Sequence, residues 1–165
     1  MPELIGTVVI GGGQAGLAAS RELTQAGVEH AVLERGRVGE TWRGRWDSFC
    51  LVTPNWSVQL PDGHYDGPDP DAFMVRDEVV DYLERYAAGA PVRENVSVDS
   101  IERRDGGFVL QTSDGELRAG SVVLATGAYQ RPHRPAGAET LPADLFQVDT
   151  DGYRNEQQLP PGRVL

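Results

Sequence analysis

The chain opens with a continuous run of apolar, β-branched residues at Thr7–Ile10, which stops at three consecutive glycines. A run of this kind is typical of a strand covered on both faces, as in a parallel sheet. Apolar residues then recur at helical spacing over residues 14–26, and Gly27 follows where a helix often ends in the left-handed conformation. A second strand is expected at Val28–Glu34. Strand, glycine turn, helix and strand in this order predict a right-handed βαβ unit.

The rest of the chain is less regular. Residues 36–70 carry many Gly, Pro and aromatic residues without periodicity, and we expect a long connection of the kind that is usually functional. A second amphipathic helix is predicted at Arg76–Ala88, with acidic residues in its first turn. Ser121–Ala125 is apolar and is expected to return to the buried sheet, whereas the polar tail from residue 131 should lie on the surface. Short segments separated by turn residues predict an antiparallel meander at Val96–Arg104, Phe108–Thr112 and Glu116–Arg118.

These elements predict an α/β fold of three layers, a Rossmann-like parallel sheet with helices and a small inserted β-meander. The length of 165 residues and a hydrophobic content of 39% suit one core, so residues 1–165 are expected to form a single domain. Val164–Leu165 resembles the start of a further strand.

Charge and cysteine content narrow the function classes. A net charge of −10 disfavours nucleic acid and anionic membrane surfaces as partners. No apolar stretch approaches the ~20 residues of a membrane span. Cys50 is the single cysteine, which excludes a Cys-x-x-Cys pair in these residues and fits a reducing, cytoplasmic setting. His30, His64 and His133 have no metal-ligand spacing, so no metal is expected.

The glycine turn is the first candidate site. Gly-x-Gly-x-x-Gly after a predicted strand and before a predicted helix is the context of a dinucleotide site. The first glycine permits the tight turn, the second lets a pyrophosphate approach the backbone, and the third lets the helix pack closely. Unpaired amides and the helix dipole would hold the phosphates. A purely structural glycine turn is the alternative. The candidate residues are Gly11, Gly12, Gly13, Gln14, Ala15 and Gly16.

Glu34 supports the dinucleotide interpretation. It ends the second predicted strand 18 residues after Gly16, near the offset of about 20 expected for a carboxylate that accepts ribose hydroxyls. A carboxylate there would repel a 2′-phosphate, so FAD or NAD is expected at this turn rather than NADP. A solvated strand end is the alternative, and the βαβ unit by itself does not separate FAD from NAD.

Three further stretches carry a resemblance to a known family. They are Val9–Leu17, the segment Leu33-Glu34-Arg35 leading into Gly39-Glu40-Thr41-Trp42, and Leu124-Ala125-Thr126-Gly127. With them the whole chain resembles the FAD-binding segment of the flavin-containing monooxygenase family and its Baeyer–Villiger relatives. The family's FAD domain also carries a meander before its last sheet strand, which favours FAD over NAD.

The resemblance implies roles for seven more residues. Arg35 would lie near the adenosine ribose, Thr41 and Trp42 beside the flavin, and the backbone of Val98 beside adenine. Thr126 and Gly127 would close over the pyrophosphate, and Asn55 lies where some relatives carry an active-site asparagine. Trp42 could instead be an ordinary core aromatic.

The family activity would be reduction of FAD by NADPH, followed by transfer of one oxygen atom of O2 to a soft nucleophile or a ketone. Asp149-Thr150 stands where relatives often place His-Ser, which removes support for a role in that linker. The 165 residues hold one Gly-x-Gly-x-x-Gly motif, so no NADPH site is expected on them and full turnover is not expected of this chain alone. A non-catalytic FAD- or nucleotide-binding piece, a subunit completed by a second chain or copy, and an NAD-dependent dehydrogenase domain stay open as alternatives.

Overall fold

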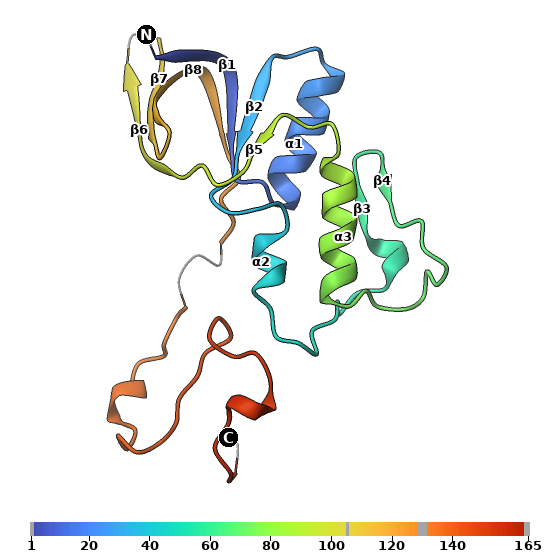
Figure 1. The fold of residues 1–165 in the computed structure, drawn as a ribbon, viewed down its shortest axis with the longest axis vertical. Helices are drawn as coiled ribbons and strands as arrows, with labels where there is room; N and C mark the ends of the chain where they lie inside the picture. Colours follow the sequence, from blue (N-terminus) through green and yellow to red (C-terminus); the bar gives the residue numbers. More distant parts are fainter. Residues whose placement is uncertain (1, 105, 129–131, 164–165) are drawn as a thin grey trace.

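A computed structural model describes residues 2–104, 106–128 and 132–163. Its main sheet has six strands in the order β5-β2-β1-β8-β7-β6 (Figure 1). The strands are β1 (Glu3–Ile10), β2 (His30–Leu33), β5 (Val92–Arg93), β6 (Val98–Arg104), β7 (Gly107–Thr112) and β8 (Gly115–Leu124). β1 pairs in parallel with β2 on one side and with β8 on the other. The first turn, helix and strand therefore form the predicted βαβ unit.

The helices lie on the side of the sheet where β2 and β5 are found (Figure 1). They are α1 (Gln14–Gln25), α2 (Glu40–Arg43) and α3 (Arg76–Ala87), with 3-10 turns η1 (Asn55–Ser57), η2 (Ala138–Thr140) and η3 (Glu156–Gln158). A hairpin of β3 (Gln59–Leu60) and β4 (Gly63–His64) packs beside α3. The predicted helices at 14–26 and 76–88 are confirmed within two residues. The short α2 and the two-residue strand β5 were not predicted.

One boundary in the meander was wrong. The sequence predicted a meander strand at 116–118 and a separate sheet strand at 121–125, but both belong to the continuous strand β8. The first half of β8 is antiparallel to β7, and the strand runs parallel to β1 from Leu117 to Leu124. Gly120 lets it continue, because a Cβ there would lie only 3.0 Å from the carbonyl oxygen of Gly6. The meander is thus an extension of the parallel sheet.

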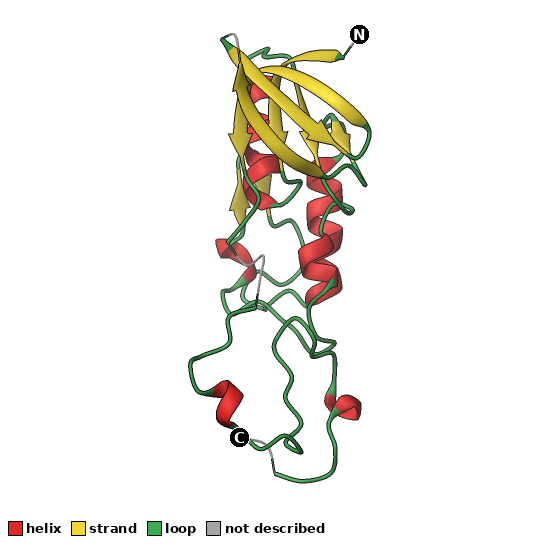
Figure 2. Ribbon diagram, turned by 90° about the vertical axis from the view of Figure 1, so that its left-hand side faces the viewer, coloured by secondary structure: helices red, strands yellow, loops and turns green. Residues whose placement is uncertain are grey.

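The buried apolar residues form two cores, one within the curled sheet and one among the helices, and the sheet with its helices confirms the predicted α/β class. Figure 2 shows the strands crossing over one another at one end of the molecule, with the two longer helices beside them. The core under the meander consists of Ile5, Val8, Ile10, Ala31, Leu33, Val96, Leu110, Leu117 and Ala119. The core among the helices consists of Leu17, Val38, Met74, Val79, Tyr82 and Leu83.

The tail of residues 132–163 extends away from the sheet beyond α2 (Figure 1). Its residues 141–148 are exposed, as predicted for the tail, and they include the apolar side chains Leu141, Leu145, Phe146 and Val148. It returns to the loop after α2, where the Asp47 amide donates to the Arg154 carbonyl at 2.8 Å and the Asn155 side chain donates to the Asp47 carboxylate at 2.7 Å. The expected strand start at Val164–Leu165 lies outside the described residues.

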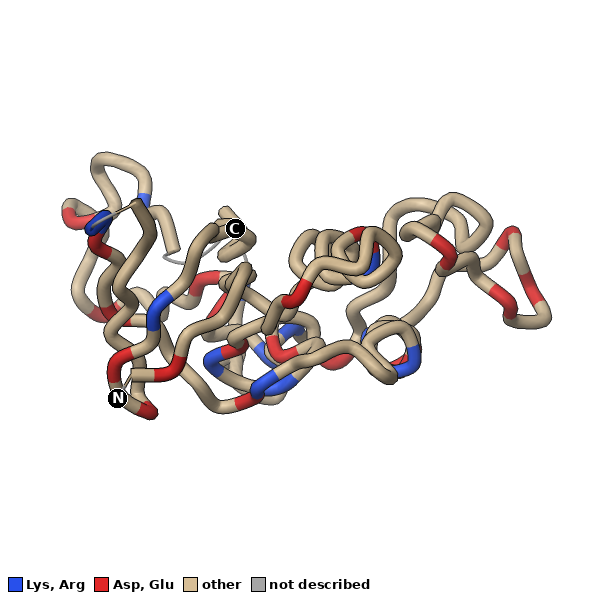
Figure 3. Tube along the Cα trace, turned by 90° about the horizontal axis from the view of Figure 1, so that it is seen from above, with Lys and Arg blue, Asp and Glu red and all other residues tan. Residues whose placement is uncertain are grey.

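Acidic residues gather at the outer end of the 59–75 connection (Figure 3). This distribution matches the net charge and offers no basic surface at that end of the molecule. Within the residues that the structure describes, no helix has the length and apolar content needed to cross a bilayer.

Candidate cofactor-binding site

The glycine turn joins β1 to α1 at the carboxyl end of the parallel strands. The Gly11 amide donates to the Leu33 carbonyl at 2.8 Å, and Gly11 has a φ of 109°, which favours glycine. A Cβ on Gly11 would collide with the Ala125 carbonyl, and one on Gly16 would collide with the Gly11 carbonyl. The first and third glycines are therefore required by close backbone approach, as the motif predicted.

The second glycine of the motif opens the helix toward empty space. Gly13 is the N-cap of α1 and makes no side-chain cap hydrogen bond. A Cβ on Gly13 would meet nothing within 4 Å, and Gly13, Gln14 and Ala15 are exposed. The first-turn amides of a helix have no partner within the helix. Together with the positive end of the helix dipole, they form a surface suited to an anion such as a pyrophosphate.

Glu34 lies directly beside this turn. Its Oε2 accepts the Gly12 amide at 2.6 Å, and its Oε1 accepts the Gly36 amide at 2.9 Å. A Cβ on Gly12 would lie 2.9 Å from the Glu34 Cβ, so the glycine also makes room for the acidic side chain. An ionised carboxylate offers about four lone-pair sites. The two that remain can accept the two hydroxyls of a ribose.

The Ala-Thr-Gly turn closes the same corner from the next strand. The Ala125 amide donates to the Ile10 carbonyl at 2.9 Å, which places the residues after β8 against the Gly11 turn. Gly127 has a φ of 75°, and both Thr126 and Gly127 are exposed. The structure thus brings residues 11–16, Glu34 and the 126–127 turn together where a doubly wound sheet binds nucleotides.

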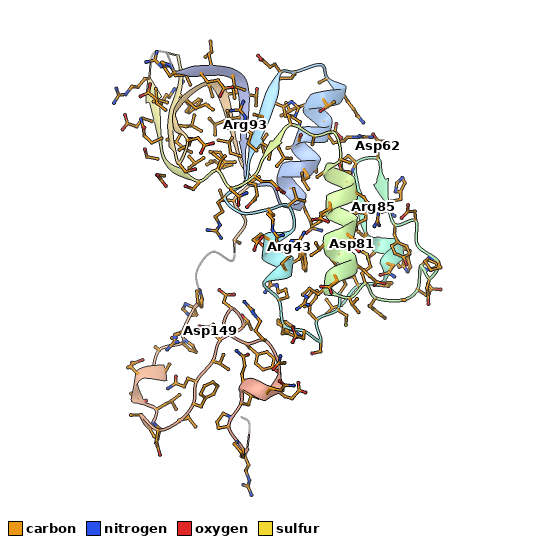
Figure 4. The ribbon with its side chains drawn as sticks, viewed as in Figure 1. Arg43, Asp62, Asp81, Arg85, Arg93 and Asp149 are labelled. Carbon is orange, nitrogen blue, oxygen red and sulfur yellow. The ribbon has the colours of Figure 1, made fainter. Side chains whose placement is uncertain are left out.

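The residues expected beside the flavin lie on α2. Thr41 is exposed, whereas Trp42 is half-buried with its ring 5.5 Å from that of Phe49 and the Arg45 guanidinium 5.9 Å from its centre. Arg43 of the same helix pairs with Glu84 of α3, and Figure 4 shows Arg43 between the two helices. Trp42 therefore packs in the helical core, and its contact with a flavin stays a prediction.

Arg35 and Val98 flank the Glu34 side of the corner. Arg35 is exposed immediately after Glu34, in a position that leaves its guanidinium accessible to a ligand. Val98 begins β6, and its side chain packs against the core under the meander. Neither position tests the ribose and adenine contacts that the resemblance implies.

Asn55 has a structural function in this chain. It is 2% exposed, its Oδ1 accepts the Met74 amide at 2.6 Å, and its Nδ2 donates to the Asp69 carbonyl at 2.9 Å. These bonds tie the two arms of the connection before α3 together. Both ends of the side chain already have partners within that connection.

The structure has one hollow next to the corner and another farther from it. The larger, of about 400 Å³, is lined by Val38, Glu84, Ala87, Ala88, Val92 and Glu94. The smaller, of about 260 Å³, lies at the opposite end of the parallel strands, beside Glu3 and His30. At the glycine turn itself Gly13, Gln14 and Ala15 are exposed, so a ligand can approach from solvent.

Among the described residues, the groups with a shifted pKa lie away from the glycine turn. Burial raises the pKa of the Tyr82 and Tyr86 hydroxyls, which donate to carbonyls of the β3–β4 hairpin. A hydrogen bond from Arg93 lowers the pKa of Glu3. The corner therefore depends on backbone amides and one carboxylate, and the chemistry available there is binding of a phosphate and a sugar.

Glu94 is a contact of this corner that sequence reasoning missed. Its Oε1 accepts the Val38 amide at 2.8 Å across 56 residues of sequence. No motif or periodicity marks it, since it follows a strand of only two residues. Its position becomes apparent only from the pairing of β5 with β2.

Comparisons with known proteins agree with this geometry. Residues 8–156 match the family model described as pyridine nucleotide-disulphide oxidoreductase. An uncharacterized CzcO-like oxidoreductase of Geobacillus kaustophilus is 39% identical over 100% of this chain and 48% of its own length. An indole-3-pyruvate monooxygenase of Oryza sativa subsp. japonica is 34% identical over 97% of this chain and 41% of its own length.

A solved structure gives the same result. A double mutant of a flavin monooxygenase from Stenotrophomonas maltophilia superposes with a TM-score of 0.78 and 28% identity, over 92% of this chain and 46% of that chain. The chain thus spans about half the length of the relatives it matches. Its relatives and neighbours are oxidoreductases and flavin monooxygenases. The chain belongs to the pyridine nucleotide-disulphide oxidoreductase family.

Proposed function

We propose that residues 1–165 form the FAD-binding part of a flavin-dependent, NADPH-using monooxygenase or closely related oxidoreductase. The observation that carries this proposal is the exposed amino end of α1 beside the Glu34 carboxylate, because a dinucleotide needs a phosphate site with a ribose site next to it. The flavin monooxygenases among the matches support FAD as the dinucleotide.

Different residues are assigned to different parts of FAD. Amides of Gly13, Gln14 and Ala15 hold the pyrophosphate, and the free lone pairs of Glu34 accept the hydroxyls of the adenosine ribose. The Thr126–Gly127 turn covers the pyrophosphate from the β8 side. When bound, FAD supplies the hydride-accepting and O2-activating chemistry, while the protein binds and orients it.

The remaining candidates extend the site at both ends. Arg35 is assigned to the adenosine side and the Val98 backbone to adenine. Thr41 and Trp42 are assigned to the flavin side, where α2 leads away from the corner. This assignment is tested separately from the phosphate and ribose contacts, because it follows from family resemblance.

Charge at the ribose site selects among dinucleotides. The Glu34 carboxylate repels a 2′-phosphate, so NADPH is not assigned to this turn. The chain holds one Gly-x-Gly-x-x-Gly motif and one cysteine, Cys50. The proposal therefore gives these residues the flavin site and neither a nicotinamide site nor a dithiol relay.

The experiment is a ligand titration of the purified chain. We expect yellow protein or, after removal of the flavin, quenching of FAD fluorescence on reconstitution. FAD should bind more tightly than NADH, and NADPH should bind more weakly than NADH. Colourless protein that takes up no added FAD would refute the proposal, and NADH binding that excludes FAD would indicate a dehydrogenase domain instead.

A further inference from the structure

The turn between β5 and β6 encloses the end of β2 where Glu34 lies. The Glu34 amide donates to the Arg93 carbonyl at 3.0 Å, and the Glu34 carbonyl accepts the Val96 amide at 2.9 Å. The Asn95 amide donates to the Gly36 carbonyl at 2.8 Å. Arg93, at the start of this turn, is labelled in Figure 4. The backbone on both sides of Glu34 is therefore fixed by one short turn.

The side chain of Glu94 extends this control to the loop after Glu34. Its carboxylate accepts the Val38 amide at 2.8 Å, and Val38 is 5% exposed. The loop of residues 36–38 is thus bonded at one end by the Asn95 backbone and at the other by the Glu94 side chain.

This loop supplies one of the two donors that orient Glu34. The Gly36 amide donates to Glu34 Oε1 at 2.9 Å, while the Gly12 amide donates to Oε2 at 2.6 Å. If Gly36 shifted, Oε1 would lose its donor. The carboxylate could then turn about the hydrogen bond that the Gly12 amide donates to Oε2. The two lone pairs directed at the ribose would then lose their fixed direction.

We infer that Glu94 is a positioning residue for the adenosine-ribose subsite, acting through the 36–38 loop on the Glu34 carboxylate. This inference rests on the proposed function, since it concerns the ligand assigned to Glu34. Asn95 allows the turn because its φ of 60° lies in the left-handed region, where asparagine is among the better tolerated residues.

Glu94 could either position Glu34 or merely stabilise the fold, and access of solvent to Glu94 distinguishes the two roles. Glu94 lines the hollow of about 400 Å³ beside α3, so water can reach the Val38 amide when the carboxylate is removed. The folded chain should therefore survive the loss of Glu94. The effect should appear in how well the loop presents Glu34 to a ribose.

The test compares ADP with 2′,3′-dideoxy-ADP, which lacks the ribose hydroxyls, by isothermal titration of the full chain. The parent chain should prefer ADP. Glu94→Ala should weaken ADP binding by about threefold to tenfold, as expected for a weakened charge-assisted hydrogen bond, and leave the dideoxy compound unchanged. Glu94→Gln, which keeps an acceptor oxygen, should restore most of the preference.

Controls distinguish the failures. Glu102→Ala removes an exposed carboxylate on β6 and should change neither affinity. If Glu94→Ala loses the same affinity for both ligands, or for neither, the inference about Glu94 is overturned and the proposed function still stands. If Glu94→Ala does not fold, Glu94→Asp, whose carboxylate is one methylene shorter, serves for the same comparison and is judged by the same outcomes. A parent chain that binds neither FAD nor ADP overturns the proposed function and the inference together.

Discussion

Replacing Glu34 by alanine should weaken the chain before any ligand is added. The side chain accepts two backbone amides, from Gly12 and Gly36, and Gly12 is buried. A hydrogen bond to a charged group contributes about 1.5–3 kcal/mol, and water can replace part of the pair because Glu34 is half-buried. We therefore expect a loss of about 1.5–3 kcal/mol in the free energy of unfolding. For a chain of this size that lowers Tm by about 3–12 °C.

The same substitution should weaken FAD binding. Losing the carboxylate removes charge-assisted bonds to the ribose hydroxyls, about 1.5–3 kcal/mol or roughly a 10- to 150-fold rise in Kd. Thermal unfolding without ligand and titration with FAD measure the two effects separately. Glu34→Gln should give intermediate values in both, because its amide oxygen can accept from one backbone donor while its NH2 faces the other.

Two results would refute this reasoning. An unchanged Tm for Glu34→Ala without ligand would mean that the bonds to Gly12 and Gly36 do not stabilise the turn. An unchanged FAD affinity would remove Glu34 from the ribose site. Glu102→Ala, on the exposed face of β6, provides the baseline for loss of one surface carboxylate.

The remaining predictions concern the glycines and the tail. Gly13→Val should melt close to the parent, because φ is −84° and a Cβ meets nothing within 4 Å, yet retain no flavin; retained flavin by absorbance would count against the phosphate site. Gly16→Ala should lower the unfolding free energy by at least about 1–3 kcal/mol through its collision with Gly11, and an unchanged denaturant midpoint would contradict that. Hydrogen bonds from Asn155 and Arg76 lower the pKa of Asp47 from 3.8, so the tail contact should be complete above pH 3.8 and be lost as pH falls through the lowered pKa. Hydrogen exchange of residues 150–158 should accelerate in that range, and the same onset in Asp47→Asn would exclude Asp47 as the cause.

The sequence predicted the parts of the fold that depend on local pattern. The first strand, α1 and the glycine turn follow from a β-branched run, helical spacing and close-approach glycines, all within 25 residues. Glu34 could be placed because its offset from Gly16 is fixed by the length of the βαβ unit. These features need no knowledge of distant partners.

Elements defined by long-range pairing were less predictable. The continuity of β8 depends on β1, more than 100 residues earlier, and the sequence masks it with Arg118, Gly120 and Ser121. Glu94 has no local signal because β5 has two residues and pairs with β2. Trp42 fits both a core aromatic and a cofactor contact by type, and its neighbours in the fold account for the first.

The single strand that serves both halves of the sheet couples them energetically. β8 is bonded to β1 from Leu117 to Leu124 and to β7 along its first half, and the residue after it lies against Gly11. Opening β8 would expose both sides at once, so the dinucleotide corner and the meander should unfold as one cooperative unit. Occupancy of the corner should therefore slow amide exchange in β7, far from any atom that the ligand touches.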